Sequence, residues 1–204
     1  MTLSLEQMNI PKLQKVAPTI YRGSTLEKSP QALMALKKSG TQTIVDFRGS
    51  GNSVLEKLCK SLNLDFFKVS FDPILAKERK AKGYKQVIDF NALKEFFKIM
   101  NRGKAYVGCQ LGIHRTNAAL TYNYFLNPQA QNAPKLLFVN DTPSNLEVKN
   151  EINRLTRMVK QYVKKLTSEQ KKSIGLEDNF KTVFDSTFKG KIAQLIKSNL
   201  RNIR

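Results

Sequence analysis

Short apolar, β-branched runs alternate with amphipathic segments along the first 130 residues, and this alternation restricts the fold more than any other feature of the chain. A strand followed by a helix and a second strand usually joins parallel neighbours. We therefore predict an α/β fold with a central, mainly parallel sheet flanked by helices. Strands are expected at 18–22, 41–47, 65–71 and 104–108, and helices at 30–38, 53–62, 86–100 and 117–126.

The composition changes after Pro128. The next stretch is rich in Asn, Gln and Pro and predicts a loop. Beyond it we expect helices at about 146–166 and 177–199, with a break near 167–175. The predicted organisation is an N-terminal segment (1–17), an α/β domain (18–128), a loop (129–145) and a basic helical C-terminal extension (146–204).

Positive charge dominates the sequence. The 204 residues include 35 Lys and Arg against 16 Asp and Glu, a formal net charge of +19. Residues 150–204 alone hold 13 Lys and Arg against 5 Asp and Glu. Such an excess favours an anionic partner: a nucleic acid, an anionic membrane surface or a phosphorylated substrate.

Several classes of protein are disfavoured by what the sequence lacks. Two cysteines are too few for a disulfide framework, and one histidine argues against a zinc site with several His ligands. The first residues do not form a secretory signal peptide, and no run approaches the roughly 18 apolar residues of a transmembrane helix. We expect a cytoplasmic protein without a transmembrane segment, and export into another cell without a classical signal peptide stays open.

The segment with the clearest chemistry is VGCQLGIHRT, residues 107–116, where a predicted strand ends and a helix begins. Ligands of open α/β sheets bind at this edge, and the amides of such a turn and the start of the next helix attract anions. The same amides and Arg115 would hold Cys109 as a nucleophilic thiolate. Arg115 offers a planar fork for two phosphoryl oxygens, and Gly112 permits the backbone torsions that turn the amides inward.

This Cys-x5-Arg segment resembles the phosphate-binding loop of the cysteine-dependent protein tyrosine phosphatase superfamily. The pattern C-x-x-G-x-x-R-[S/T] is matched by Cys109, Gly112, Arg115 and Thr116. The resemblance runs from about Pro18 to Leu126. Within it, residues 20–24 (IYRGS) and 43–48 (TIVDFR) are similar to the compact dual-specificity and related atypical phosphatases.

The resemblance implies a two-step reaction that needs no metal and no cofactor. Cys109 would attack phosphorus to give a phosphocysteine, and Arg115 with the loop amides would stabilise the equatorial oxygens of the transition state. Thr116 would donate a hydrogen bond to the sulfur and aid its departure. The substrate phosphate would bind within the loop, at Gln110, Leu111, Gly112, Ile113, His114 and Arg115.

The family's general acid is an aspartate on a loop ahead of the helix that precedes the catalytic strand. Asp72 is the matching candidate, which would protonate the leaving oxygen and then activate water. More residues separate Asp72 from Cys109 than in the compact members of the family, and an insertion at 76–83 would explain the difference. Asp89 is the rival and is expected inside the helix. Basic residues of the insertion would steer an anionic substrate: Lys77, Arg79, Lys80 and Lys82.

One position departs from the family pattern. Gly108 precedes the cysteine where the family commonly has a histidine, which would leave the thiolate less well organised and the activity reduced or altered. The single histidine of the chain, His114, lies inside the loop instead and would face the rim of the site.

Other polar and apolar residues have simpler explanations. Cys59 lies on an apolar helical stripe and is expected in the core, with a redox partnership to Cys109 as the alternative. Asp46 and Arg48 would either line the site or form a structural pair at a strand end. The core is expected to include Phe66, Phe67, Phe90, Phe96 and Phe97.

The function expected from this resemblance is hydrolysis of phosphate monoesters, with a phosphorylated protein as the default substrate of a dual-specificity or tyrosine phosphatase. The positive charge keeps two other substrates open. One is a phosphoinositide or inositol phosphate, with peripheral contact to an anionic membrane. The other is an RNA 5′-triphosphate, because residues 112–116 (GIHRT) are similar to the pattern G-[I/F]-N-R-T of RNA 5′-triphosphatases.

Two non-catalytic functions also stay open. A phosphate-binding pseudophosphatase is suggested by Gly108. A plain nucleic-acid-binding protein fits the charge, but no binding motif is present and aromatic residues are not interleaved with the basic tail.

Overall fold

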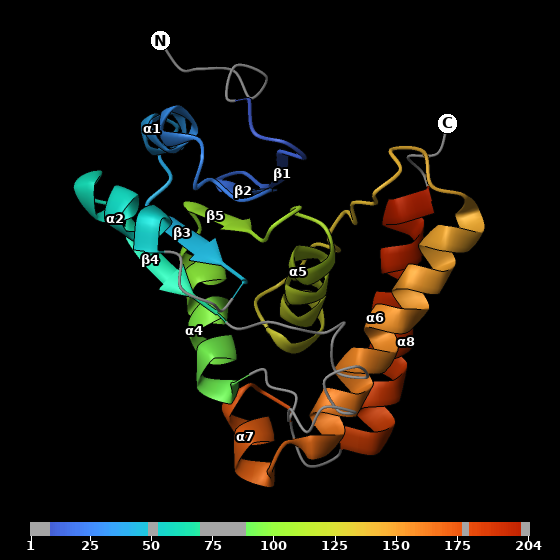
Figure 1. The fold of residues 1–204 in the computed structure, drawn as a ribbon. Coiled ribbons are helices and arrows are strands. Elements are labelled where there is room, and N and C mark those ends of the chain that lie inside the picture. Colours follow the sequence, from blue (N-terminus) through green and yellow to red (C-terminus); the bar gives the residue numbers. More distant parts are fainter. Residues whose placement is uncertain (1–8, 49–52, 70–88, 177–179, 201–204) are drawn as a thin grey trace, which may run out of the picture. The chain divides into compact units, whose positions relative to one another are not determined.

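The computed structural model describes residues 9–48, 53–69, 89–176 and 180–200, with side chains of the last helix described from residue 186 onward (Figure 1). The chain divides into two compact units, Met1–Thr116 and Asn117–Arg204. The predicted general acid Asp72 lies outside the described residues. So do the predicted steering residues Lys77, Arg79, Lys80 and Lys82.

The first unit is built on a five-stranded sheet with the strand order β1-β2-β5-β3-β4. β2, β5, β3 and β4 are parallel, and β1 pairs with β2 antiparallel. The mainly parallel sheet predicted from the alternating pattern is therefore confirmed. The strands are β1 (Gln14–Ala17), β2 (Ile20–Gly23), β3 (Thr43–Asp46), β4 (Asp65–Lys68) and β5 (Ala105–Gly108).

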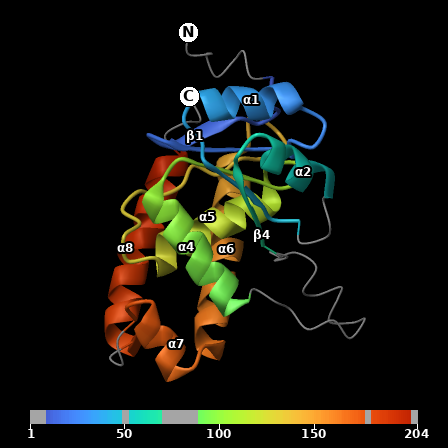
Figure 2. The ribbon, with the colours of Figure 1, turned by 90° about the vertical axis from the view of Figure 1, so that its left-hand side faces the viewer.

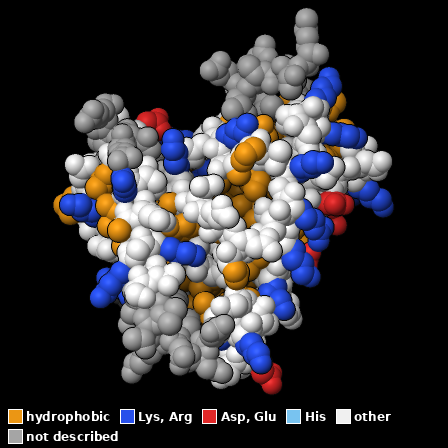
Figure 3. Space-filling model, turned by 180° about the vertical axis from the view of Figure 1, so that it is seen from behind, with side chains coloured by type: hydrophobic (Ala, Val, Ile, Leu, Met, Phe, Trp, Pro, Cys, Tyr) orange, Lys and Arg blue, Asp and Glu red, His pale blue; other side chains and the backbone are white. Residues whose placement is uncertain are grey.

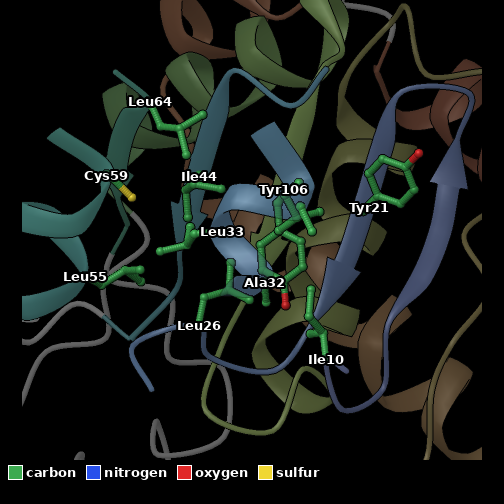
Figure 4. Packing of buried hydrophobic residues seen from close by; sticks show 12 residues of the cluster. Ile10, Tyr21, Leu26, Ala32, Leu33, Ile44, Leu55, Cys59, Leu64 and Tyr106 are labelled. Atoms are coloured by element: carbon green, nitrogen blue, oxygen red, sulfur yellow. The ribbon is translucent and has the colours of Figure 1, made fainter. Parts of the chain in front are cut away.

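Two helices cover one face of this sheet. α1 (Pro30–Lys38) and α2 (Ser53–Ser61) contribute Leu33, Leu36, Leu55 and other apolar side chains to a cluster with Tyr21, Ile44 and Tyr106 of the strands (Figure 4). Successive side chains of a strand alternate between faces, so the intervening residues of these strands face the other way.

α4 (Phe90–Arg102) lies on the other face, as Figures 1 and 2 show. Its buried residues recur at helical spacing, and the ring of Phe96 meets that of Phe47 edge-on with centroids 5.3 Å apart. The sheet is thus covered on both faces, which explains why β2 and β5 are buried along their whole length.

The parallel register determines where the site is formed. Gly108, the last residue of β5, is the register partner of Gly23 on β2 and of Asp46 on β3. The carboxyl ends of three strands therefore coincide, and the residues that follow them emerge at one edge.

The second unit is helical. α5 (His114–Leu126) begins at the end of the first unit and continues into the second, where α6 (Asn145–Lys165), α7 (Ser168–Ser173) and α8 (Phe180–Leu200) follow. α6 and α8 lie side by side (Figures 1 and 2). Residues 127–144 contain no helix or strand.

Several boundaries differ from the sequence predictions. β1 lies inside the predicted N-terminal segment, and α7 interrupts the predicted break at 167–175. α7 forms because Thr167 and Gln170 make a capping box at its start. The two units meet at Thr116–Asn117, whereas the sequence placed the end of the α/β domain at residue 128.

The aromatic core was predicted only in part. Phe96 and Phe97 are buried, as expected. Phe66 is half-buried and packs against the core cluster of the first unit. Phe67 and Phe90 are also only half-buried, which the prediction did not anticipate. β4 is the edge strand of the sheet, so its side chains have a neighbouring strand on one side only. None of the described helices carries an apolar stretch long enough to cross a bilayer.

Candidate active site

The candidate site is the turn between β5 and α5. β5 ends at Gly108 and α5 begins at His114, so residues 109–113 form the whole connection. Cys109 is only 4% exposed, and Gly112 and Ile113 are also buried. Gln110, Leu111 and His114 are exposed, so the turn has an inner and an outer side.

Backbone hydrogen bonds fix this turn on two sides. The Phe47 amide donates to the Gly108 carbonyl at 2.9 Å, and the Thr25 amide donates to the Gln110 carbonyl at 3.5 Å. Within the turn, the Gly112 amide donates to the Cys109 carbonyl at 3.2 Å. The turn is therefore held by the chain that leaves β2 and β3 as well as by its own bonds.

Glycine is required at two of its positions. Gly112 has φ +68°, and a Cβ there would lie 2.3 Å from the carbonyl carbon of Gly23, a backbone atom that cannot turn aside. At Gly108 a Cβ would lie 3.0 Å from both the Gly23 oxygen and Tyr106 Cε1. The departure from the family pattern at Gly108 thus has a local cause, because β2 and the Tyr106 ring occupy the space of a side chain.

A buried arginine lies beside the turn. Arg22 on β2 has no solvent exposure, and its Nη2 donates to the Gly112 carbonyl at 2.8 Å. Burial lowers its pKa from the ordinary 12.5 to about 10, and the electrostatic interactions of Arg22 with Cys109 and Tyr106 act in the opposite direction. Arg22 was not among the predicted site residues. A charged residue inside a strand whose other positions are apolar or small could have indicated that Arg22 has a special role.

Asp46 and Arg48 form a structural pair, the second of the two alternatives that the sequence left open. Arg48 donates from Nε and Nη2 to both oxygens of Asp46, at 2.6–3.0 Å, and from Nη1 to Glu27 at 2.7 Å. Although burial acts against it, these bonds raise the pKa of Arg48. The positive charge of Arg48 thus lies against the negative charges of Asp46 and Glu27, as a structural ion pair requires.

The residues predicted to act with Cys109 lie in the first turn of α5. Arg115 is half-buried and Thr116 is fully buried. Thr116 Oγ1 has no hydrogen-bond partner among the described residues. The bond from Thr116 to the cysteine sulfur that the resemblance implies is therefore not formed in this structure.

Asp89 and Cys59 lie away from the turn in sequence, and each has a structural role. Asp89 lies at the start of α4, not inside it as predicted, and its carboxylate accepts from the amides of Asn91 at 2.7 Å and Ala92 at 3.0 Å. It is thus the N-cap of the helix. Cys59 is fully buried in the core, as expected, and burial raises its pKa to about 12.

No protein-family model matches the chain, and no curated protein sequence matches it. Among solved structures, the chain is similar to a candidate phosphatase of the DUF442 type from Shewanella putrefaciens, with 20% identity, a TM-score of 0.49 and coverage of 80% of this chain and 97% of that one. It is also similar to the core catalytic domain of the PP-IP phosphatase Siw14 from S. cerevisiae (12%, 0.43, 89% and 95%). A third similar structure is TpbA from P. aeruginosa (12%, 0.46, 79% and 89%).

Each of these three similarities has a TM-score below 0.5 and an identity of at most 20%. Similarity at this level does not assign an activity to the chain. What the chain can do therefore has to be argued from the turn between β5 and α5 itself.

Proposed function

We propose that the protein is a cysteine-dependent phosphatase that hydrolyses phosphate monoesters through a phosphocysteine at Cys109. One observation carries this proposal: a buried cysteine opens the five-residue turn after a central parallel strand, and the helix that follows this turn holds Arg115 in its first turn. A helix N-terminus and a guanidinium together favour a bound phosphate dianion.

The proposed reaction has two steps. In the first, the Cys109 thiolate attacks phosphorus, the S–P bond forms and the P–O bond to the leaving group breaks, while the general acid gives its proton to the leaving oxygen. In the second, the same group takes a proton from water, the water oxygen attacks phosphorus and the S–P bond breaks. Arg115 stabilises the charge on the phosphoryl oxygens in both steps.

Asp72 is the general acid in this proposal. Asp89 is the less suitable candidate, because its carboxylate already accepts two amide hydrogen bonds at the start of α4. These bonds hold the carboxylate at the start of its own helix, whereas a general acid must reach the leaving oxygen.

Phosphorylated protein is the substrate that we propose first, in the manner of dual-specificity and tyrosine phosphatases. Lys and Arg side chains are numerous on the face seen in Figure 3. A phosphoinositide and an RNA 5′-triphosphate remain the alternative substrates, because the net charge of +19 favours any anionic partner.

The test compares two cysteine variants on a generic aryl phosphate. Cys109→Ser should abolish turnover, because a hydroxyl is a far weaker nucleophile than a thiolate. Cys59→Ala, the matched control, should keep turnover near wild type, since Cys59 lies in the core. Activity that survives Cys109→Ser would refute the mechanism. Phosphate binding without turnover in the wild type would identify a pseudophosphatase.

Two further measurements refine the proposal. Asp72→Asn should slow turnover most for substrates with poor leaving groups, and Asp89→Asn should not; the reverse result would exchange their roles. Phosphopeptides, phosphoinositides and 5′-triphosphorylated RNA should then be compared by kcat/KM, and a preference for either of the last two would replace protein as the substrate class.

A further inference from the structure

The side of the turn that faces β2 has no room for a residue like the histidine of the family pattern. A Cβ at position 108 would meet Gly23 O, Tyr106 Cε1 and Ser24 O at 3.0–3.2 Å. The Tyr106 hydroxyl donates to the Ser24 carbonyl, which holds the ring in this place. Any group that supports Cys109 from this side must therefore come from another element.

Arg22 occupies that side of the turn. It lies on β2, 90 residues from Gly112 in sequence, yet its Nη2 is 2.8 Å from the Gly112 carbonyl oxygen. Gly112 is the residue with positive φ at which the turn reverses. A buried carbonyl needs a donor, and a planar guanidinium, whose donors are fixed relative to one another, restricts the direction of that carbonyl.

Arg22 also brings a positive charge to the turn. The pKa of Arg22, about 10, is still well above neutrality, so the guanidinium is charged at pH 7. Burial raises the pKa of Tyr106 well above its ordinary range, so Tyr106 is neutral there. Asp46 is bound to Arg48. The guanidinium of Arg22 is thus a buried cation with its Nη2 on the Gly112 carbonyl of the turn.

We propose that Arg22 is a positioning residue of the phosphate-binding turn: it fixes the Gly112 carbonyl and brings a buried guanidinium to the side of the turn that faces β2. This inference rests on the proposed function in so far as the turn binds a phosphate. It gives a chain that has Gly108 before its cysteine a different means of organising the turn.

The test measures the affinity of the folded protein for inorganic phosphate, together with kcat and KM for an aryl phosphate. Arg22→Lys keeps the charge, but its ammonium lacks the planar fork, so its affinity for inorganic phosphate should fall about tenfold. Arg22→Gln also removes the charge and should lower this affinity at least as much.

Arg48→Lys is the matched control, because Arg48 is also a mostly buried arginine of the first unit, but its described partners are Asp46 and Glu27. It should lower the melting temperature and leave the phosphate affinity unchanged. A loss of packing alone would lower the melting temperature of the Arg22 variants in the same way without changing the phosphate affinity of the folded protein.

Each outcome decides the proposal. A folded Arg22→Gln with wild-type phosphate affinity would overturn it. If Arg22→Gln does not fold, Arg22→Lys decides: a clear loss of phosphate affinity supports the proposal, and wild-type affinity overturns it. Failure of the proposed function gives a different result, because a protein that hydrolyses no phosphate monoester can still show the dependence of phosphate affinity on Arg22.

Discussion

The two compact units of this chain bury different kinds of polar side chain. The first unit buries charges, namely Arg22 beside a thiol and Asp46 bound to Arg48. The second unit buries neutral amides, above all Asn117 and Asn199. Burying a charge is much more costly than burying an amide that is fully hydrogen-bonded.

The amides of the second unit complete the hydrogen bonding of an irregular stretch. Asn199 accepts from the Leu136 amide at 2.7 Å and donates to the Pro134 carbonyl at 3.0 Å. Asn117 accepts from the Leu137 amide at 3.1 Å and donates to its carbonyl at 2.8 Å. Each side chain thus replaces backbone partners that a neighbouring strand would otherwise supply.

The comparison separates structural from functional burial. A neutral amide that exchanges a donor and an acceptor with nearby backbone is fully explained by folding. A guanidinium buried against a carbonyl is not explained by that bond alone, because a neutral donor would satisfy the same carbonyl at a smaller desolvation cost. Changes at the turn of the first unit and at Arg22 should therefore alter chemistry, and changes in the second unit should alter stability alone.

The largest effect is expected from Gly112→Ala. The added methyl group would lie 2.3 Å from the Gly23 carbonyl carbon at a φ of +68°, so the turn must move. Because displacing reacting groups by about 1 Å costs on the order of 100-fold in rate, turnover of an aryl phosphate should fall by at least about that factor. The measurement is kcat together with the affinity for inorganic phosphate.

Gly175→Ala is the matched change in the second unit. Gly175 also has positive φ, +74°, and its Cβ would meet Pro128 Cγ at 3.0 Å. It should lower the free energy of unfolding by about 1–2 kcal/mol and leave kcat unchanged. If Gly112→Ala lowered only stability, or Gly175→Ala lowered turnover in the folded protein, the distinction between the two units would be broken.

The next effect is expected from Asn199→Ala. The buried side chain of Asn199 bonds both the Leu136 amide and the Pro134 carbonyl. The change to alanine removes both bonds. The free energy of unfolding should fall by about 1–3 kcal/mol, measured by urea denaturation. The affinity for inorganic phosphate should not change. A loss of that affinity would show that the buried amides of the second unit also affect the chemistry of the turn.

Most of the fold was predictable from local patterns. The apolar runs at 41–47 and 104–108 and the amphipathic segment at 30–38 each became the expected element, because a fully buried strand and a half-buried helix leave distinct periodicities. β1 was missed, because a four-residue edge strand with an exposed lysine has neither periodicity nor a continuous apolar run.

The turn itself was predictable, but its supporting residues were not. Cys109, Gly112 and Arg115 are contiguous, so their spacing is visible in the sequence. Arg22 contacts Gly112 across 90 residues, a proximity created only by the pairing of β2 with β5. Asp89 was misplaced because helical periodicity does not determine where a helix starts, whereas the capping bonds of its carboxylate do.

The smallest effect is expected at the start of α6, where Ser144 and Glu147 form a capping box. Ser144→Ala should lower the free energy of unfolding by about 1 kcal/mol at pH 7, with kcat unchanged.

The hydrogen bonds from Ser144 lower the pKa of Glu147 below its ordinary 4.5. A carboxyl with a lowered folded-state pKa stabilises the protein above its unfolded-state value, and this contribution is lost as the pH falls through the folded-state pKa. The stability difference between wild type and Ser144→Ala should therefore narrow below pH 4.5, which melting curves at pH 7 and at acidic pH will measure. A difference that stays constant with pH would show that Ser144 caps the helix without the help of the Glu147 carboxylate.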